Sequence, residues 1–207
     1  MIAKWRVDSR PPRGDATPPT PRRVVLTFDD GPHPDHTPEL LDVLVKEGIT
    51  AIFFVCGKHV SVPAGRRIVA RAASDGHVIG NHAYSHRRLT GMTRHEIRSE
   101  IQRTHELVTE FEPAAKIFRP PYGSSNRDVE DTLAEFGYRL VLWDVDSGDW
   151  QAGAQPVGWI RSSIEQIVER PSSIVLAHDK CATTVRNFPQ FLSRLRARSA
   201  VEFVTAT

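Results

Sequence analysis

Short apolar runs alternate along the chain with longer segments in which apolar residues recur every three or four positions. The first run, 24–28, is β-branched and aromatic, and a helical pattern that Gly48 ends follows it. Continued to the end of the chain, the pattern gives expected strands at 24–28, 51–55, 77–80, 117–118, 138–143, 173–177 and 201–205. Helices are expected at 38–47, 63–75, after Thr93, at 126–136, from 156 and at 187–198. This order predicts an α/β fold of parallel strands with helices outside.

Capping residues mark the start of two of these helices. Thr37 before Pro38 predicts the start of the first helix, because threonine is a good N-cap and proline suits the first helical position. Thr93 is expected to cap the long amphipathic helix in the same way.

The composition narrows the class of protein. The chain has 207 residues, of which 40% are hydrophobic and 25% charged, and its formal net charge is +2. These values are ordinary for one soluble domain with a substantial core. Basic clusters such as Arg22–Arg23 and Arg87–Arg88 have acidic residues nearby, so we expect solvated faces and no nucleic-acid partner. The two cysteines show no CxxC spacing, which favours structural thiols.

The first residues bear on location and domain organisation. The N-terminus carries charges where a signal peptide needs a continuous apolar stretch, and no run approaches the length of a membrane-spanning helix. We therefore expect a cytoplasmic protein with no membrane partner, or a secreted one if a signal segment precedes these residues. Residues 9–21 hold five prolines and several charges. This composition predicts a flexible arm over 1–21 and a single domain over 22–207.

Two adjacent carboxylates, Asp29 and Asp30, stand at the end of the first expected strand. Neighbouring side chains of a regular strand point to opposite faces, so the two can share one site only where the pleat breaks. The Gly31-Pro32 pair supplies such a break. Close carboxylates repel each other, which raises one pKa unless a cation lies between them. Taken alone, such a pair is more typical of two solvated acids in a loop, and it is the rest of the chain that favours a shared site.

Other chemically active residues also follow expected strands. They are His82, Arg119, the stretch 144–150 and His178. In α/β folds of this kind the carboxyl ends of the strands form one rim, where functional residues collect. We therefore expect these residues to meet the aspartate pair in one site.

His82 and His86 are four positions apart, which is one face of a helical turn, so both could reach one metal ion. Ala83 stands where zinc proteases of the HExxH type carry a glutamate. An isolated HxxxH segment fits two ordinary polar histidines, but together with a strand-end aspartate it becomes a three-ligand set. Three ligands and an open position for water are typical of catalytic zinc, which lowers the pKa of that water to about 7.

The remaining motifs each admit two interpretations. Arg119 begins a rigid Arg-Pro-Pro-Tyr-Gly segment, suited to holding a carboxylate and aiming a backbone N–H at a substrate, or to a surface ion pair at a plain turn. Trp150 would either stack on a sugar ring or lie in the hydrophobic core. We expect Trp143 to lie in the core. His178 would be a core histidine or, with Asp149 beside it, an acid whose pKa is raised.

Five motifs in this order resemble the NodB-like polysaccharide deacetylases. They are TFDDGP at 27–32, HxxxH at 82–86, RPPYG at 119–123, DSGDW at 146–150 and LAH at 176–178. The similarity spans residues 23 to about 205. It implies a distorted (β/α) barrel, usually of seven parallel strands with outer helices. It also implies metal-dependent N-deacetylation of N-acetylglucosamine-type sugars, as in chito-oligosaccharides and peptidoglycan.

The resemblance implies a metal site and a base. Asp30, His82 and His86 would bind the metal ion, usually zinc, with cobalt or another divalent ion as the alternative. Asp29 would be the general base, held in place by Arg119.

The resemblance further implies an acid and a substrate pocket. His178 would protonate the leaving amine, tuned by Asp149. The backbone N–H of Tyr122 would help to stabilise the oxyanion, and Trp150 and Leu176 would line the pocket for the acetyl group.

Two segments depart from the family pattern. Ala83 replaces the serine or threonine commonly found after the first histidine, which removes a loop-stabilising hydroxyl but no ligand. The segment 180–184 matches no motif, although it borders the expected pocket. We expect an N-acetylated amino-sugar substrate, either a small chito-oligosaccharide or a related soluble metabolite.

Two other functions stay open. One is hydrolysis of a non-sugar amide, such as a cyclic imide or a natural-product N-acyl group. His82 and His86 make a cyclic imide the less favoured substrate, because relatives that act on imides commonly lack these histidines. The other is carbohydrate binding without turnover. Asp29 and His178 discriminate here, because binding alone requires neither a base nor an acid.

Overall fold

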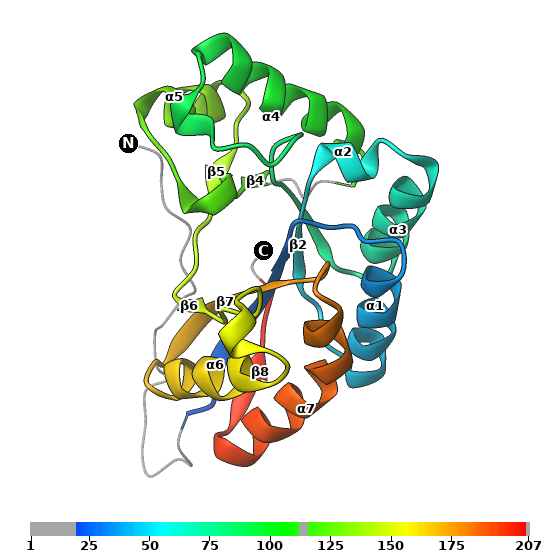
Figure 1. Ribbon diagram of the computed structural model, residues 1–207, viewed down its shortest axis with the longest axis vertical. Helices are drawn as coiled ribbons and strands as arrows, with labels where there is room; N and C mark the ends of the chain where they lie inside the picture. Colours follow the sequence, from blue (N-terminus) through cyan, green and yellow to red (C-terminus); the bar gives the residue numbers. More distant parts are fainter. Residues whose placement is uncertain (1–19, 112–115, 206–207) are drawn as a thin grey trace.

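The computed structural model describes residues 20–111 and 116–205, and it shows a curved β-sheet with helices around its outer side (Figure 1). The strands are β1 (Arg22–Asp29), β2 (Ile52–Val55), β3 (Val78–Asn81), β4 (Ile117–Phe118), β5 (Arg139–Leu140), β6 (Val145–Asp146), β7 (Ser172–His178) and β8 (Val201–Phe203). The α-helices are α1 (His36–Glu47), α2 (Gly57–Val60), α3 (Pro63–Ser74), α4 (Arg94–Val108), α5 (Arg127–Glu135), α6 (Gly158–Val168) and α7 (Ala182–Arg198). Short 3-10 helices lie at Leu89–Gly91 (η1), Pro121–Gly123 (η2) and Ala152–Ala154 (η3).

The strands pair in the order β5-β4-β3-β2-β1-β7-β6, and every pairing is parallel. The short β8 pairs with the first residues of β1, ahead of the point where β2 joins it. Among the described residues, the path of seven strands ends at β5 on one side and β6 on the other. The fold is therefore the distorted, incompletely closed (β/α) barrel expected from the sequence.

The pleat of the central strands separates an outer set of side chains from an inner set. Val24, Leu26 and Phe28 of β1 share one core cluster with apolar residues of α1, α3, α6 and α7. Val25 belongs to another cluster, which is built mainly from the strands: Val25, Ile52, Phe54, Ile117, Val141 and Ile174. Alternate residues of a strand share a face, so Thr27 and Asp29 follow Val25 on the inner side.

β7 repeats this arrangement beside β1. The facing pairs on the inner side are Val25 with Ile174, Thr27 with Leu176, and Asp29 with His178. The register therefore places Asp29 and His178 at one level of the sheet, at the carboxyl ends of the two strands.

The first helix does not start as the sequence predicts. α1 begins at His36, so Thr37 lies inside it rather than at its N-cap. The Thr37 hydroxyl instead donates to Asp179 Oδ2 at 2.5 Å and accepts from the backbone N–H of His33 at 2.7 Å. By contrast, Thr93 caps α4 in a complete capping box with Glu96, as expected.

The expected strand 138–143 is shorter in the structure. β5 covers two residues, and the chain pairs again as β6, which was not expected. The carbonyl groups of Val141 and Leu142 accept hydrogen bonds from the Arg119 side chain at 3.3 and 3.1 Å. These residues therefore bind the guanidinium where the sequence predicts that the strand continues. α7 begins at Ala182, five residues before the expected start at 187. Most of the predicted arm, residues 1–19, lies outside the described part of the chain.

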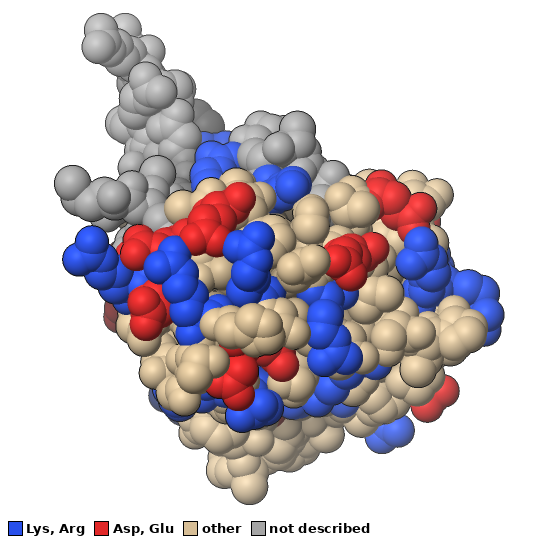
Figure 2. Space-filling model, turned by 90° about the horizontal axis from the view of Figure 1, so that it is seen from above, with Lys and Arg blue, Asp and Glu red and all other residues tan. Residues whose placement is uncertain are grey.

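The face that carries α4 and α5 presents basic and acidic side chains side by side (Figure 2). Some of these side chains form ion pairs: a guanidinium nitrogen of Arg94 and one of Arg98 each lie 2.5 Å from a carboxylate oxygen of Glu135. Over the described residues, no helix has both the length and the apolar character needed to cross a membrane.

Candidate active site

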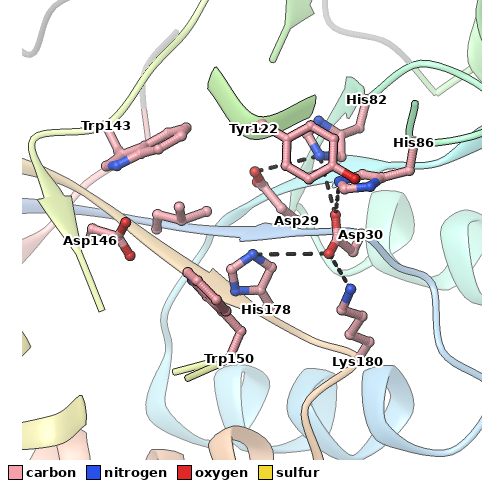
Figure 3. Close-up of a pocket in the computed structure, with 11 residues that line it drawn as sticks. Asp29, Asp30, His82, His86, Tyr122, Trp143, Asp146, Trp150, His178 and Lys180 are labelled. Carbon is pink, nitrogen blue, oxygen red and sulfur yellow. Dashed lines mark ion pairs between the residues drawn. The ribbon is translucent and has the colours of Figure 1, made fainter. Parts of the chain in front are cut away.

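A cavity of about 430 Å³ opens at the carboxyl ends of the strands (Figure 3). Its lining residues are Asp29, Asp30, His82, His86, Tyr122, Trp143, Asp146, Trp150, Leu176, His178 and Lys180. Two further residues of the predicted site, Arg119 and Asp149, are fully buried and contact the lining from behind. The structure thus brings all ten predicted site residues together.

The adjacent aspartates reach one cavity because the backbone turns between them. β1 ends at Asp29, and Asp30 has a left-handed φ of 77°. This conformation turns Asp30 out of the alternating pattern, so both carboxylates approach His82 Nε2, at 3.8 Å for Asp29 Oδ2 and 3.3 Å for Asp30 Oδ1. Gly31 is required next, because a Cβ there would lie 2.1 Å from Asp179 Oδ2.

Arg119 fixes one of the two carboxylates. Its Nη1 donates to Asp29 Oδ1 and to Thr27 Oγ1, both at 2.7 Å, and its guanidinium lies over the ring of Phe54. The side chain is completely buried, so the alternative of a surface ion pair is wrong. Burial lowers the pKa of Arg119, and the negative charge of Asp29 opposes that change. Asp29 is thereby held through Oδ1, while Oδ2 faces the cavity side.

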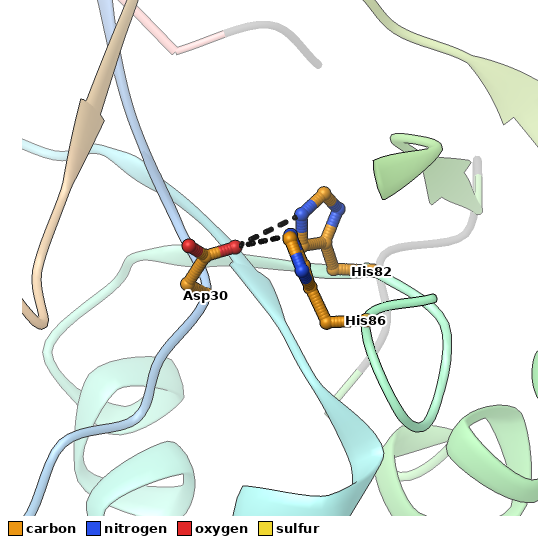
Figure 4. A group of neighbouring side chains, drawn as sticks. All are labelled: Asp30, His82 and His86. Atoms are coloured by element: carbon orange, nitrogen blue, oxygen red, sulfur yellow. Dashed lines mark ion pairs between the residues drawn. The ribbon is translucent and has the colours of Figure 1, made fainter. Parts of the chain in front are cut away.

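Asp30, His82 and His86 form a compact group (Figure 4). Their ligand atoms all lie within 4.8 Å of one another, and His86 Nε2 is 2.8 Å from Asp30 Oδ1. His82 Nδ1 lies 2.7 Å from the carbonyl oxygen of Arg119. Because a carbonyl can only accept, the proton of a neutral His82 sits on Nδ1, and the lone pair of Nε2 points toward Asp30.

The chemistry of this group fits a divalent cation. Asp30 Oδ1 is buried and no donor meets hydrogen-bond geometry to it, although two imidazole nitrogens are close. Lone pairs facing a carboxylate at such distances are favourable when a cation lies between them. If the imidazoles are protonated instead, burial raises the pKa of Asp30, but their hydrogen bonds and charge outweigh it and hold that pKa far below its ordinary value. Asp30 is ionised in either case.

The segment that carries the two histidines is a loop, so the expected helical turn is wrong. Ala83 and His86 both have left-handed φ values, 60° and 63°. The imidazoles meet because the loop folds back on itself, which leaves their ring centroids 5.1 Å apart.

His178 and Asp149 form a second buried pair. His178 Nδ1 lies 2.6 Å from Asp149 Oδ1, and Asp149 Oδ2 accepts from the His178 backbone N–H and the Thr184 hydroxyl, both at 2.8 Å. Burial lowers the pKa of His178, but the hydrogen bond and charge of Asp149 dominate and raise it to about 9. His178 Nε2 is directed into the cavity, 4.0 Å from Asp30 Oδ2. A protonated His178 is therefore available as an acid at neutral pH.

Aromatic side chains form much of the cavity wall. Tyr122, which has a φ of 61°, and Trp150 are 57% and 59% exposed, so the interpretation of Trp150 as a core residue is wrong. Trp143 also lines the cavity, on the side away from His86, which corrects the expectation that it lies in the core. The buried Leu176 completes an apolar part of the lining.

One charged residue of the lining, Lys180, was given no role from the sequence. Lys180 Nζ lies 2.5 Å from Asp30 Oδ2; burial lowers the pKa of Lys180, but the Asp30 carboxylate outweighs it and raises that pKa. Asp146, which belongs to the stretch 144–150 expected at the rim, ends β6 on the opposite side of the cavity. The sequence did contain a signal for Lys180. It stands two positions after His178 at a strand end, and alternate residues of an extended segment point to the same side.

The fold and this rim of aspartate and histidine side chains define an enzyme-type α/β barrel with a candidate metal centre. More narrowly, the chain belongs to the polysaccharide deacetylase family, whose model matches residues 16–141. The deacetylases of this family depend on a metal ion, and Asp30, His82 and His86 form a candidate site for one.

Known relatives carry names that agree with the family. A chitooligosaccharide deacetylase of Rhizobium leguminosarum is 36% identical over 167 residues, which cover 77% of this chain and 73% of that protein. The peptidoglycan-N-acetylglucosamine deacetylase PgdA of Listeria monocytogenes is 34% identical over 192 residues; the match covers 90% of this chain but 38% of the relative's length. A family 4 carbohydrate esterase from Streptomyces lividans, solved in complex with acetate, superposes with a TM-score of 0.79 at 29% identity, covering 90% of this chain and 93% of that one. The family and the barrel expected from the five motifs are confirmed.

Proposed function

We propose that the protein is a metal-dependent N-deacetylase that hydrolyses the acetamide of an N-acetylglucosamine-type sugar to a free amine and acetate. The observation that carries the proposal is that Asp29 and His178 lie at one level of the sheet and both approach the Asp30-His82-His86 group: Asp29 Oδ2 is 3.8 Å from His82 Nε2, and His178 Nε2 is 4.0 Å from Asp30 Oδ2. A base and an acid beside a three-ligand group are the parts that amide hydrolysis requires. The names of the relatives support the sugar substrate.

Asp30, His82 and His86 would hold the ion. The mixed nitrogen and oxygen donors suit zinc, with cobalt as an alternative. A divalent ion bound there would polarise the acetamide carbonyl and lower the pKa of an attacking water.

Asp29 would act as the general base. Its Oδ1 is engaged by Arg119 at 2.7 Å, so Oδ2 is the atom that can take a proton from the water that attacks the carbonyl carbon. Arg119 Nη1 donates both to Thr27 Oγ1 and to Asp29 Oδ1, and this shared donor fixes the orientation of the carboxylate. The base is therefore oriented before the substrate arrives.

His178 would act as the general acid. Asp149 accepts the Nδ1 proton, which leaves Nε2–H directed into the cavity. When the C–N bond breaks, that proton passes to the departing nitrogen, and the products are acetate and the amine. The backbone N–H of Tyr122 would donate to the carbonyl oxygen as negative charge develops on it.

The cavity wall supports a sugar substrate. Exposed aromatic faces of the kind offered by Trp150 and Tyr122 stack on the apolar faces of sugar rings. Leu176 supplies apolar surface for the acetyl methyl group. A small chito-oligosaccharide suits this open cavity, and it is the substrate that we propose.

The test is acetate release from N-acetylglucosamine oligomers of increasing length, with zinc or cobalt supplied and Asp29→Asn as the matched variant. We expect metal-dependent release that falls by at least about 100-fold in the variant, the scale of losing a general base. A chain that binds the oligomers without releasing acetate would instead be a carbohydrate-binding homologue. Release from small N-acyl compounds but not from sugars would favour the non-sugar amide hydrolase.

A further inference from the structure

A buried glutamate of α4 contacts the loop between the two histidines. Glu100 is 8% exposed, and its carboxylate faces Tyr84 and Ser85. Oε2 accepts the backbone N–H groups of Tyr84 at 3.0 Å and Ser85 at 2.8 Å, and Oε1 accepts the Ser85 hydroxyl at 2.8 Å. One carboxylate thus takes three hydrogen bonds from two consecutive residues.

The position of Glu100 on its helix is unusual for a charged residue. The buried face of α4 consists of Ile97, Glu100, Ile101, Thr104 and Val108. A carboxylate on such a face is unfavourable unless hydrogen bonds replace the water that it loses. The Tyr84-Ser85 backbone supplies those bonds, so Glu100 and the loop stabilise each other.

The loop needs fixed anchors because its conformation is strained. Ala83 and His86 both adopt left-handed φ values without being glycine, a conformation that persists only where surrounding contacts impose it. The first part of the loop is anchored elsewhere. Asn81 Oδ1 accepts the Ala83 N–H at 2.9 Å, and the carbonyls of Ala83 and Tyr84 accept from Gly57 and Lys58 of α2 at 3.0 and 2.9 Å.

Glu100 anchors the second part, directly before His86. Ser85 precedes that histidine in the chain, and both its N–H and its hydroxyl donate to the Glu100 carboxylate. Movement of Ser85 would change the direction of the His86 ring, whose Nε2 lies 2.8 Å from Asp30 Oδ1. The contact between α4 and the loop is therefore continuous with the candidate metal group.

We propose that Glu100 is a positioning residue of the metal site, which sets metal affinity by holding Tyr84 and Ser85 so that His86 faces Asp30. Glu100 itself contacts neither the ion nor the substrate. The proposal rests on the proposed function insofar as it takes Asp30, His82 and His86 as the ligands. Groups that orient metal ligands typically change affinity by about 10- to 100-fold when they are removed.

The test measures zinc affinity by competition with a chromophoric chelator, without any activity readout. Glu100→Ala and the isosteric Glu100→Gln are compared with the parent chain. The matched control is Glu96→Ala, because Glu96 lies one turn earlier on the same helix and also accepts a backbone N–H and a hydroxyl, both from Thr93. We expect a dissociation constant about 10- to 100-fold weaker for Glu100→Ala, a weakening of a few-fold for Glu100→Gln, whose amide oxygen can still accept the two N–H groups, and a change below about twofold for Glu96→Ala.

A second readout separates positioning from general stability. The visible absorption of bound cobalt reports ligand geometry, so it should change in Glu100→Gln and stay constant in Glu96→Ala, even though both variants lower the midpoint of urea unfolding. Ser85→Ala removes one of the three bonds and should weaken binding by only a few-fold. If Glu100→Ala does not fold, Glu100→Gln carries the test.

Affinity within twofold of the parent in the Glu100 variants would overturn the proposal. A parent chain that binds zinc but releases no acetate would contradict the proposed function and leave the role of Glu100 intact. A parent chain that binds no zinc would overturn both.

Discussion

Every nitrogen of the Arg119 guanidinium donates a hydrogen bond. The side chain is completely buried and donates to Asp29, to Thr27 and to the carbonyls of Val141 and Leu142. These contacts depend on the planar arrangement of the guanidinium donors as well as on its positive charge. A lysine could not reproduce them, because its ammonium group does not present several donors in a fixed plane. The same contacts shorten β5 and orient Asp29, so one side chain connects the core to the site.

Replacing Arg119 tests this dual role. Arg119→Met leaves Asp29 buried without its partner, and we expect a loss of about 3–5 kcal/mol in the free energy of unfolding at pH 7, as when one half of a buried pair is removed. Urea unfolding measures this loss. Arg119→Lys keeps the charge and should lose less stability while still impairing acetate release. A methionine variant within about 1 kcal/mol of the parent would contradict the account.

The pH dependence of activity should follow His178. Its pKa is raised to about 9 because Asp149 outweighs the effect of burial. An acid must be protonated to work, so kcat/KM should be retained up to about pH 9 and fall as the pH rises further. In Asp149→Asn the favourable charge is gone, and the alkaline limb should move to lower pH. A pH profile from 6 to 10 for both proteins measures this, and an unmoved limb would argue against His178 as the acid.

The same shift has a consequence for stability. A histidine whose pKa is higher in the folded than in the unfolded chain stabilises the fold fully below the unfolded value of about 6.5. That contribution is lost as the pH rises through about 9. Urea midpoints should therefore decline between pH 6.5 and 9 in the parent more steeply than in His178→Gln.

Single residues were predictable where a motif and a strand end coincide. Asp29, His82 and His178 were placed at the rim by that argument, and the structure puts them there. Lys180, Trp143 and Glu100 were not found, because their roles come from contacts across the fold. Glu100 did leave a signal, since a charged residue on the apolar face of α4 implies a buried polar partner.

At the scale of elements, α4 follows its sequence closely. Thr93 accepts from the Glu96 N–H at 3.3 Å, and Glu96 accepts from the Thr93 N–H at 2.9 Å. We expect Thr93→Ala to lower the free energy of unfolding by about 1 kcal/mol, while Thr93→Ser has a smaller effect, because serine is an equally good cap. Urea unfolding compares the two. An alanine variant as stable as the serine variant would show that the cap contributes nothing.

Other element boundaries were mispredicted for reasons that are local to the site. Thr37 fits an N-cap by sequence, but its hydroxyl bonds to Asp179 of the β7-α7 connection. The HxxxH spacing suggests a helical turn, but the loop contains left-handed Ala83 and His86, which no sequence rule anticipates for these residue types. In each case a tertiary contact near the cavity prevails over local preference.

At the scale of the whole molecule, the parallel register explains how distant residues meet. Asp29 and His178 are paired residues of adjacent strands although 149 positions separate them in the chain. The alternating pattern of strands and helices predicted a common rim, and the family resemblance predicted the barrel. The pairing of β1 with β7 and β8 was not predictable from that pattern, because it specifies which elements alternate but not their order in the sheet.

A bound ion should stabilise the whole domain. A ligand that binds the folded chain only contributes about 2.7 kcal/mol at a free concentration 100 times its dissociation constant. For a domain near 200 residues this corresponds to roughly 5–10 °C in Tm. Zinc should produce this shift, a chelator should reverse it, and His86→Ala should reduce it sharply. Calorimetry with equal chelator controls measures the effect, and a parent chain whose Tm ignores zinc would oppose a metal site at Asp30, His82 and His86.

The central claim is that these three residues hold a metal ion on which Asp29 and His178 depend for N-deacetylation. The most direct measurement is a titration of chelator-treated protein with zinc, in which bound metal and acetate release from a chito-oligosaccharide are followed in the same samples. We predict that release rises in proportion to bound zinc and saturates at one ion per chain, and that His86→Ala needs far more zinc to reach any activity. Acetate release that is already complete in the metal-free protein, or that does not follow the bound zinc, would contradict the account.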